Sequence, residues 1–117
     1  MKLLCMLHSL DLEVGQIGTT VRKGAKWLYQ TEQDQELELC VCPNGPHAPE
    51  DKNIAGHGTI VETWFGRFKD VPARFLEKEH EERSRQYSGL FDSMRKVYGQ
   101  NFAPSNLVTV LVYLRTN

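Results

Sequence analysis

The sequence lacks long apolar runs and any excess of charge of one sign. No hydrophobic stretch approaches the roughly 20 residues that a membrane-spanning helix needs. The apolar start, Met1 to Leu7, is too short for a secretory signal and has no small-residue cleavage site. The chain has 14 Lys and Arg and 15 Asp and Glu, so its formal net charge is -1. Contact with nucleic acid therefore requires a local basic face. We expect a cytoplasmic protein without a membrane segment.

Cysteine is scarce as well. The chain has three cysteines, two of them in Cys40-Val41-Cys42, and an odd number of this kind fits a reducing compartment better than a disulfide framework. Cys40, Cys42, His47 and His57 have the ligand types of a zinc site, but structural zinc sites use wider cysteine spacing. We interpret both cysteines as small apolar residues at the end of a strand and expect no bound metal.

Nucleotide-cofactor fingerprints and nucleophile motifs are also absent. Gly15-Gln16-Ile17-Gly18 and Gly56-His57-Gly58 lack the extension and the following helix of a phosphate-binding loop. No nucleophile elbow surrounds a serine or a cysteine. We therefore expect no ATP, NAD or other cofactor.

What is present is the pattern of one small α+β domain over residues 1–117, whose 40% hydrophobic content is enough for one modest core. Glycines make 11–22 look like a loop, and 26–30 is expected to form a hairpin with the strand that follows it. The expected strands are 3–7, 26–30, 36–42, 56–61 and 107–114.

Two helices are expected before the last strand. Asp70 can cap the first, which has Pro72 in its first turn and runs to about Gln86. Gly99 ends the second. Its apolar stripe at helical spacing is Tyr87, Leu90, Phe91, Met94, Val97 and Tyr98. The order of elements predicts a small β-barrel of about five to six strands, with two helices inserted before the C-terminal strand.

Basic and aromatic residues gather around two of the expected strands. Bases stack on aromatic rings while Lys or Arg neutralises phosphate, so this mixture is typical of a face that binds single-stranded or looped RNA. Ordinary edge-strand solubility and core packing explain the same residues, and that alternative stays open. The candidate nucleic-acid-binding residues are Arg22, Lys23, Lys26, Trp64 and Arg67.

An acidic run on the first expected helix offers a general base. A carboxylate that faces a cleft can take a proton if burial raises its pKa, whereas pairing with basic residues four positions apart favours a solvated face. Glu81 and Glu82 are the better candidates because they lie near the end of the helix. The run consists of Glu77, Glu79, His80, Glu81 and Glu82.

The order of these segments resembles the ASCH domains of the PUA-like superfamily. The matching stretches are 56–61, Phe68-Lys69-Asp70-Val71-Pro72, Val97-Tyr98-Gly99 and Leu107-Val108-Thr109-Val110. The resemblance covers the C-terminal half well and the N-terminal half loosely. It implies a PUA-like barrel with a cleft between the barrel and its helices, and RNA, a nucleotide or a nucleoside as the partner.

A looser similarity links the chain to the small bacterial acetylcytidine amidohydrolases. Their Gly-x-Lys-Thr-x-Thr-x-Arg segment corresponds to 15–22, which keeps Thr20 and Arg22 and has Ile17 at the lysine position. The similarity implies an alternative function, a small hydrolase of a modified nucleoside or RNA that uses Thr20, a lysine and Glu81 or Glu82. With Ile17 at the lysine position, Lys23 or Lys26 would have to take that part, and the candidate catalytic residues are Thr20, Lys26 and Glu82. Whether the protein is an enzyme stays open, as does a protein-binding role for its exposed aromatic residues.

Overall fold

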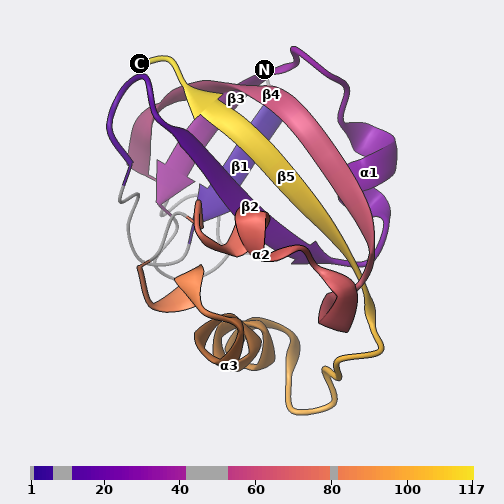
Figure 1. Cartoon of the computed structure of the whole chain (residues 1–117). Coiled ribbons are helices and arrows are strands. Elements are labelled where there is room, and N and C mark those ends of the chain that lie inside the picture. Colours follow the sequence, from indigo (N-terminus) through magenta and orange to yellow (C-terminus); the bar gives the residue numbers. More distant parts are fainter. Residues whose placement is uncertain (1, 7–11, 42–52, 80–81) are drawn as a thin grey trace.

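A curled sheet forms the body of the molecule (Figure 1). The computed structural model describes residues 2–6, 12–41, 53–79 and 82–117, with Leu4 the only described side chain of the first strand. The sheet has the order β1-β3-β4-β5-β2. Its strands are β1 (Lys2–Met6), β2 (Ile17–Lys23), β3 (Glu36–Val41), β4 (Asn53–Arg67) and β5 (Leu107–Arg115).

The sheet is a half-barrel and not the closed barrel that we expected. Four strands, β3, β4, β5 and β2, pair antiparallel in that order, and β1 joins the edge of β3 in parallel. Within the described part of the chain β1 and β2 do not pair. The expectation of five to six barrel strands is therefore corrected to four antiparallel strands with one parallel addition.

Two N-terminal assignments were wrong. Residues 17–23 form β2 and not a loop, because β5 pairs with this segment along its whole length. Residues 26–30 form the short helix α1 (Lys26–Gln30) and not a strand. Gly24 has a φ of +83° and turns the chain out of the sheet, so no strand lies beside α1. A short apolar run does not by itself distinguish helix from strand, and the predicted hairpin is replaced by pairing of β3 with β1 and β4.

The excursion between β4 and β5 contains short helices and one longer helix. They are the 3-10 helices η2 (Phe68–Asp70) and η3 (Glu82–Arg85), and the α-helices α2 (Ala73–Leu76) and α3 (Tyr87–Tyr98). The predicted continuous helix to Gln86 was wrong, because residues 78–79 leave the helical path to pair with β2: the Thr19 N–H donates to the Lys78 carbonyl at 2.7 Å. The second predicted helix and its end at Gly99 are confirmed.

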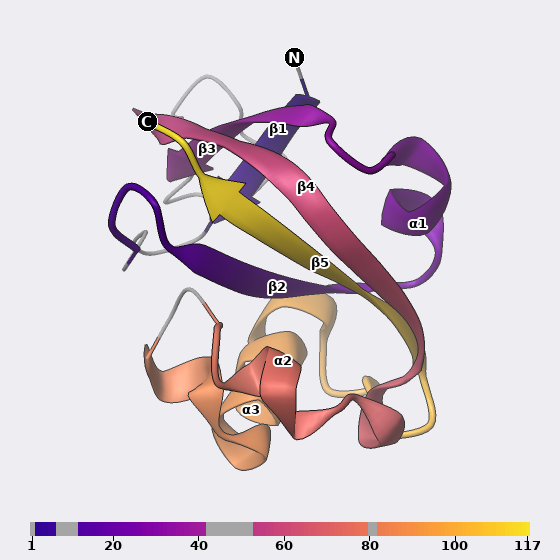
Figure 2. The same cartoon turned by 45° about the horizontal axis from the view of Figure 1, so that its top comes forward.

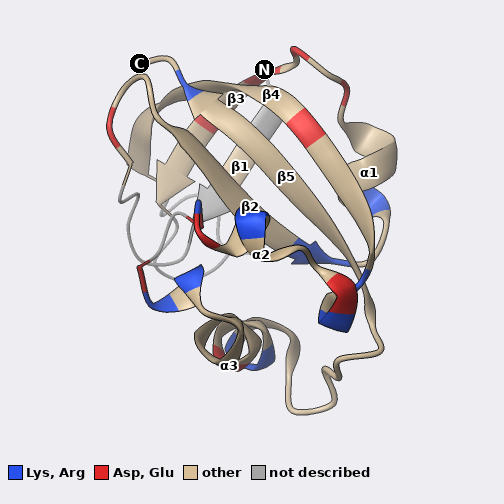
Figure 3. Ribbon diagram, viewed as in Figure 1, with Lys and Arg blue, Asp and Glu red and all other residues tan. Residues whose placement is uncertain are grey.

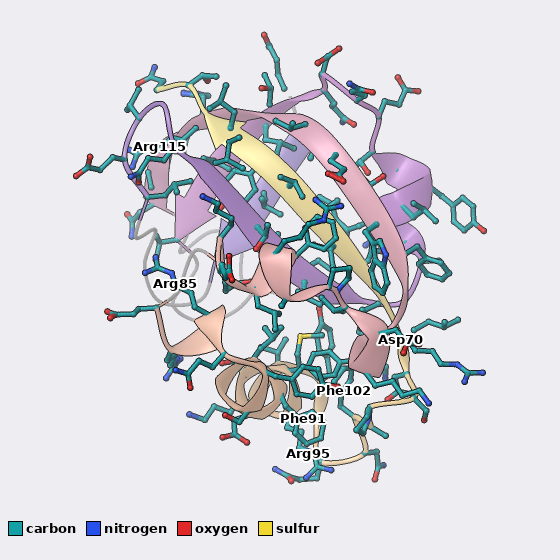
Figure 4. All side chains as sticks on the ribbon, viewed as in Figure 1. Asp70, Arg85, Phe91, Arg95, Phe102 and Arg115 are labelled. Atoms are coloured by element: carbon teal, nitrogen blue, oxygen red, sulfur yellow. The ribbon has the colours of Figure 1, made fainter. Side chains whose placement is uncertain are left out.

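Apolar residues fill both faces of the sheet. On the helix face, covered by α2 and α3 (Figure 2), Phe91 and Phe102 lie together near α3 (Figure 4), with ring centroids 6.0 Å apart. The helix-face cluster includes Val21, Phe68, Phe75, Leu90, Met94, Val108 and Val110. The opposite, inner face holds Leu4, Leu12, Leu37, Leu39, Ile60, Leu111 and Tyr113. No helix of the described chain is long and apolar enough to cross a bilayer.

Candidate functional site

Three of the predicted binding residues lie at one end of the sheet. β2 ends at Lys23 and β4 ends at Arg67, and these residues pair with Val108 and Leu107 at the start of β5. Lys26 follows on α1, directly beyond the end of β2, and Figure 3 shows the basic segments at the end of β2 and on α1 on the same side of the molecule. All three basic side chains are exposed. Lys23 pairs with Val108 of the helix-face cluster and leaves the sheet on the helix face, whereas Arg67 pairs with Leu107 and leaves it on the inner face. We call Lys23, Lys26 and Arg67 the strand-end basic surface.

Arg22 lies on the inner face, beside this surface. Its guanidinium lies over the ring of Trp27, 5.5 Å from the ring centroid, and both side chains are half-buried. Arg22 and Phe65 both pair with Thr109. Since directly paired residues of antiparallel strands share a face, Phe65 lies on the inner face too, where 37% of its surface is exposed. Cation and aromatic surface thus meet at this end of the sheet.

Trp64 does not lie on the inner face with Arg22 and Phe65. It pairs with Val110, which also pairs with Val21, so its ring lies on the helix face, where it packs 6.4 Å from the ring of Phe75. The aromatic residues near the basic surface are Trp27 and Phe65; they belong to the basic and aromatic group of the sequence, but Trp64 was chosen as the binding residue in their place. Alternation along β4 puts Trp64 and Phe65 on opposite faces, but only the strand register shows which face carries Arg22.

The three residues of the hydrolase alternative are not brought together. Thr20 is buried on β2, opposite Leu111, whereas Lys26 on α1 and Glu82 on η3 are exposed. Figures 1 and 2 place α1 and residues 82–85 on opposite sides of β2. Glu81 lies outside the described residues.

Among the described residues of the acidic run, Glu79 is buried. Only 3% of it is exposed, and its backbone pairs with Thr19 at the outer edge of β2. The Nε of Arg85 (labelled in Figure 4) donates to the Glu79 carbonyl at 3.0 Å. Helical spacing gave no signal for this burial, because α2 ends at Leu76 and residues 78–79 leave the helical path.

Tyr113 brings a hydroxyl into the inner face. The residue is fully buried, and its hydroxyl has no hydrogen-bond partner among the described residues. Burial, followed by the charge of Glu79, raises the pKa of this phenol far above its ordinary value, while Arg22 and Arg115 lower it. Tyr113 is therefore neutral at physiological pH and available as a hydrogen-bond donor. Sequence reasoning missed it because Tyr113 reads as one more apolar residue of the last strand.

Of the candidate metal ligands, only Cys40 and His57 lie within the described residues. Cys40 is buried in β3, and Cys42 and His47 fall outside the described residues. In the part of the chain that the structure describes, no group of three or more His, Cys, Asp or Glu side chains could hold an ion. A shallow depression follows the irregular part of β4, lined by Gln33, Ile60, Val61, Glu62 and Thr63, but it contains neither the basic surface nor Glu79.

Comparisons with known proteins bear on the fold. No protein-family model and no curated protein matches the sequence. Among solved structures, the chain is similar to the crystal structure of protein EF3133 from Enterococcus faecalis V583, of family DUF984, with a TM-score of 0.54 and 9% identity. The match covers 84% of this chain and 60% of that chain. The likeness supports a small α+β, barrel-like fold.

Proposed function

We propose that the protein binds RNA or a nucleotide at the sheet end formed by β2, β4 and α1. The phosphates contact Lys23, Lys26 and Arg67, and a base lies against Trp27 or Phe65. The observation that carries this proposal is the strand register. It brings the exposed Arg67 to the inner face, which also carries the half-buried Arg22 guanidinium and the rings of Trp27 and Phe65, and Lys26 follows directly beyond the end of β2.

The phosphate contacts are local. With a formal net charge of -1, the whole molecule does not attract a polyanion, so binding depends on the few cations at the strand ends. Each phosphate neutralised by Lys or Arg releases condensed counterions, and affinity then falls as salt rises. We expect a shallow salt dependence, equivalent to about two or three phosphate contacts.

The aromatic contacts favour a single-stranded nucleic acid as the ligand. A base that is free of a duplex stacks on an aromatic ring with little sequence preference. Trp27 lies on the cationic side of the sheet and Trp64 on the helix face, so the two tryptophans report on different surfaces. Only Trp27 is expected to sense the ligand.

The test is a titration of the protein with short fluorescent RNA and DNA oligonucleotides at low and moderate salt. We expect saturable binding, with quenching that Trp27→Phe abolishes and Trp64→Phe retains. Lys26→Ala and Arg67→Ala should each weaken binding and reduce the salt slope by about one. Lys96→Ala removes an exposed cation from α3 and is the matched control. Equal affinity for Lys26→Ala and Lys96→Ala contradicts the proposal, as does the absence of saturable binding.

The hydrolase alternative is less well supported. It needs a lysine ammonium and a carboxylate within hydrogen-bond reach of each other in one pocket. Lys26 and Glu82 are exposed and belong to elements on opposite sides of β2 (Figure 2). We therefore favour binding over catalysis.

A further inference from the structure

β4 extends well beyond the strand that pairs with it on one side (Figure 1). It has 15 residues, whereas its neighbour β3 has six and pairs with it only as far as Thr59. The turn before β3 adds the last hydrogen bonds on this side: the Ile60 N–H donates to the Gln35 carbonyl at 2.9 Å, and the Ile60 carbonyl accepts from the Asp34 N–H at 2.8 Å. From 61 to 67 no described strand pairs with this side of β4. We call this stretch the free edge of β4.

The main-chain groups of Thr63 and Phe65 point to the free edge. The Leu107 carbonyl accepts from the Gly24 N–H at 2.8 Å, so Leu107 directs its main-chain groups toward β2. Because successive residues of a strand direct these groups to alternate sides, Val108 and every second residue after it bond to β4. Their partners on β4 are Glu62, Trp64 and Gly66. The residues between these partners therefore face away from β5, and no main-chain hydrogen bond reaches them from that side within the described residues.

The free edge is open to another strand. Unpaired N–H and C=O groups along a strand edge form a template for pairing with a further chain. The shallow depression lined by Gln33 and residues 60–63 lies at the start of this edge. Val61 and Phe65 expose 38% and 37% of their surfaces. Both main-chain groups and apolar side-chain surface are thus available for contact.

The two ends of the free edge carry opposite charges. At its start lies the turn 32–35, in which Glu32 and Asp34 are exposed. At its end lies Arg67, an exposed member of the strand-end basic surface. A second copy of the same edge, running antiparallel, places its basic end beside this acidic turn and its acidic turn beside this basic end. A parallel copy brings like charges together, so the charge pattern is complementary to itself in the antiparallel direction alone.

We propose that two copies of this chain associate through the free edges of β4, antiparallel and about a twofold axis at Trp64. Thr63 then pairs with Phe65 of the partner subunit, and each such pair exchanges both of its main-chain hydrogen bonds. A β-branched residue opposite an aromatic residue also stabilises antiparallel strands through side-chain contact. Arg67 lies opposite Val61 of the partner subunit, next to the acidic turn. The same patch meets itself, as twofold symmetry requires.

The association does not depend on the proposed function. It uses main-chain groups of β4 and leaves the ring of Phe65 on the inner face. Arg67 is common to both proposals, so a phosphate and the carboxylates of a second copy compete for it. An interface made by one strand from each copy is small, and small interfaces give weak, transient complexes. We therefore expect a weak dimer.

The test is sedimentation velocity of the protein alone, over a roughly hundredfold range of concentration, because mass action makes the dimer fraction depend on concentration. We expect a monomer–dimer equilibrium that weakens as salt rises. Thr63→Pro should weaken dimerisation at least about tenfold, since it removes an N–H of the pairing and places a ring at the edge. The monomer should stay folded, because this N–H does not bond to β5. Thr63→Val keeps the N–H and is the matched control.

Charge exchange tests the antiparallel arrangement. Glu32→Lys and Arg67→Glu should each weaken the dimer, because each brings like charges together at both ends. An equimolar mixture of the two variants should restore it, since opposite charges then meet at both ends of the mixed dimer. Glu32 is preferred to Asp34, whose φ of +66° disfavours lysine. Lys96→Glu makes the same change of charge on α3 and should dimerise like the wild type.

A wild-type protein that stays monomeric over the whole concentration range overturns the inference, and so does unchanged dimerisation of a folded Thr63→Pro variant. A mixture of the two charge variants that dimerises no more tightly than either variant alone overturns the antiparallel pairing. Urea unfolding checks that each variant is folded. If Thr63→Pro does not fold, the charge variants decide, because their substitutions lie at exposed side chains.

Discussion

Replacing Tyr113 by phenylalanine should make the protein more stable. The ring is fully buried and its hydroxyl has no hydrogen-bond partner among the described residues. A buried polar group without a partner costs about 1–3 kcal/mol of desolvation. Tyr113→Phe removes this group and keeps the ring in place against the inner-face cluster.

The expected gain is smaller than the full desolvation cost, because the hydroxyl also makes van der Waals contacts with its surroundings at Gly18. We expect the free energy of unfolding to rise by about 1 kcal/mol, which raises the melting temperature of a domain of this size by roughly 3–6 °C. Urea unfolding at pH 7 measures the change. Because the variant exposes nearly the same surface on unfolding, the slope of the transition should stay constant and its midpoint should rise.

Tyr98→Phe is the matched control, since Tyr98 is half-buried on the helix face, where its ring lies 6.2 Å from that of Phe102. We expect a change within about 0.5 kcal/mol for this variant. A loss of 1 kcal/mol or more in Tyr113→Phe refutes the reasoning, because it shows that the hydroxyl has a stabilising partner in the free protein.

Two further predictions concern the same part of the fold. Because folding raises the pKa of Tyr113, the unfolding free energy of the wild type relative to Tyr113→Phe should be constant below the unfolded pKa of about 10 and should fall above it, by up to about 1.4 kcal/mol per pH unit. A constant difference between pH 9 and 11 would contradict this expectation. Gly18→Ala should destabilise the protein by about 1–3 kcal/mol in urea unfolding, because the added Cβ would lie 2.9 Å from Leu12 and 3.1 Å from the Tyr113 hydroxyl oxygen. A variant as stable as the wild type would show that both side chains move away freely.

The local patterns of the sequence predicted several elements correctly. The helical stripe of 87–98 and its terminal glycine correspond to α3, and the long apolar run 107–114 corresponds to β5. The alternating segment 36–42 corresponds to β3. These elements have strong periodicity of their own, and their side chains pack as that periodicity requires.

The wrong secondary-structure predictions share a physical cause. Residues 17–23 contain Gly18 and looked like a loop, but β5 supplies a complete pairing partner and the missing side chain makes room for Tyr113. The charged run after Leu76 looked like a solvated helix, yet pairing of Glu79 with Thr19 draws it away from a helical path. In each case a contact with a residue distant in the sequence outweighed the local preference.

The candidate site divides in the same way. The sequence by itself determined which residue types are available: a few cations near two strands, aromatic residues beside them, and carboxylates in one run. Only the tertiary structure decided which of them meet, because the pairing register sends neighbouring residues of a strand to opposite faces. It brings Lys23, Lys26 and Arg67 to one end of the sheet, puts Trp64 on the helix face, and buries Glu79 at the edge of β2.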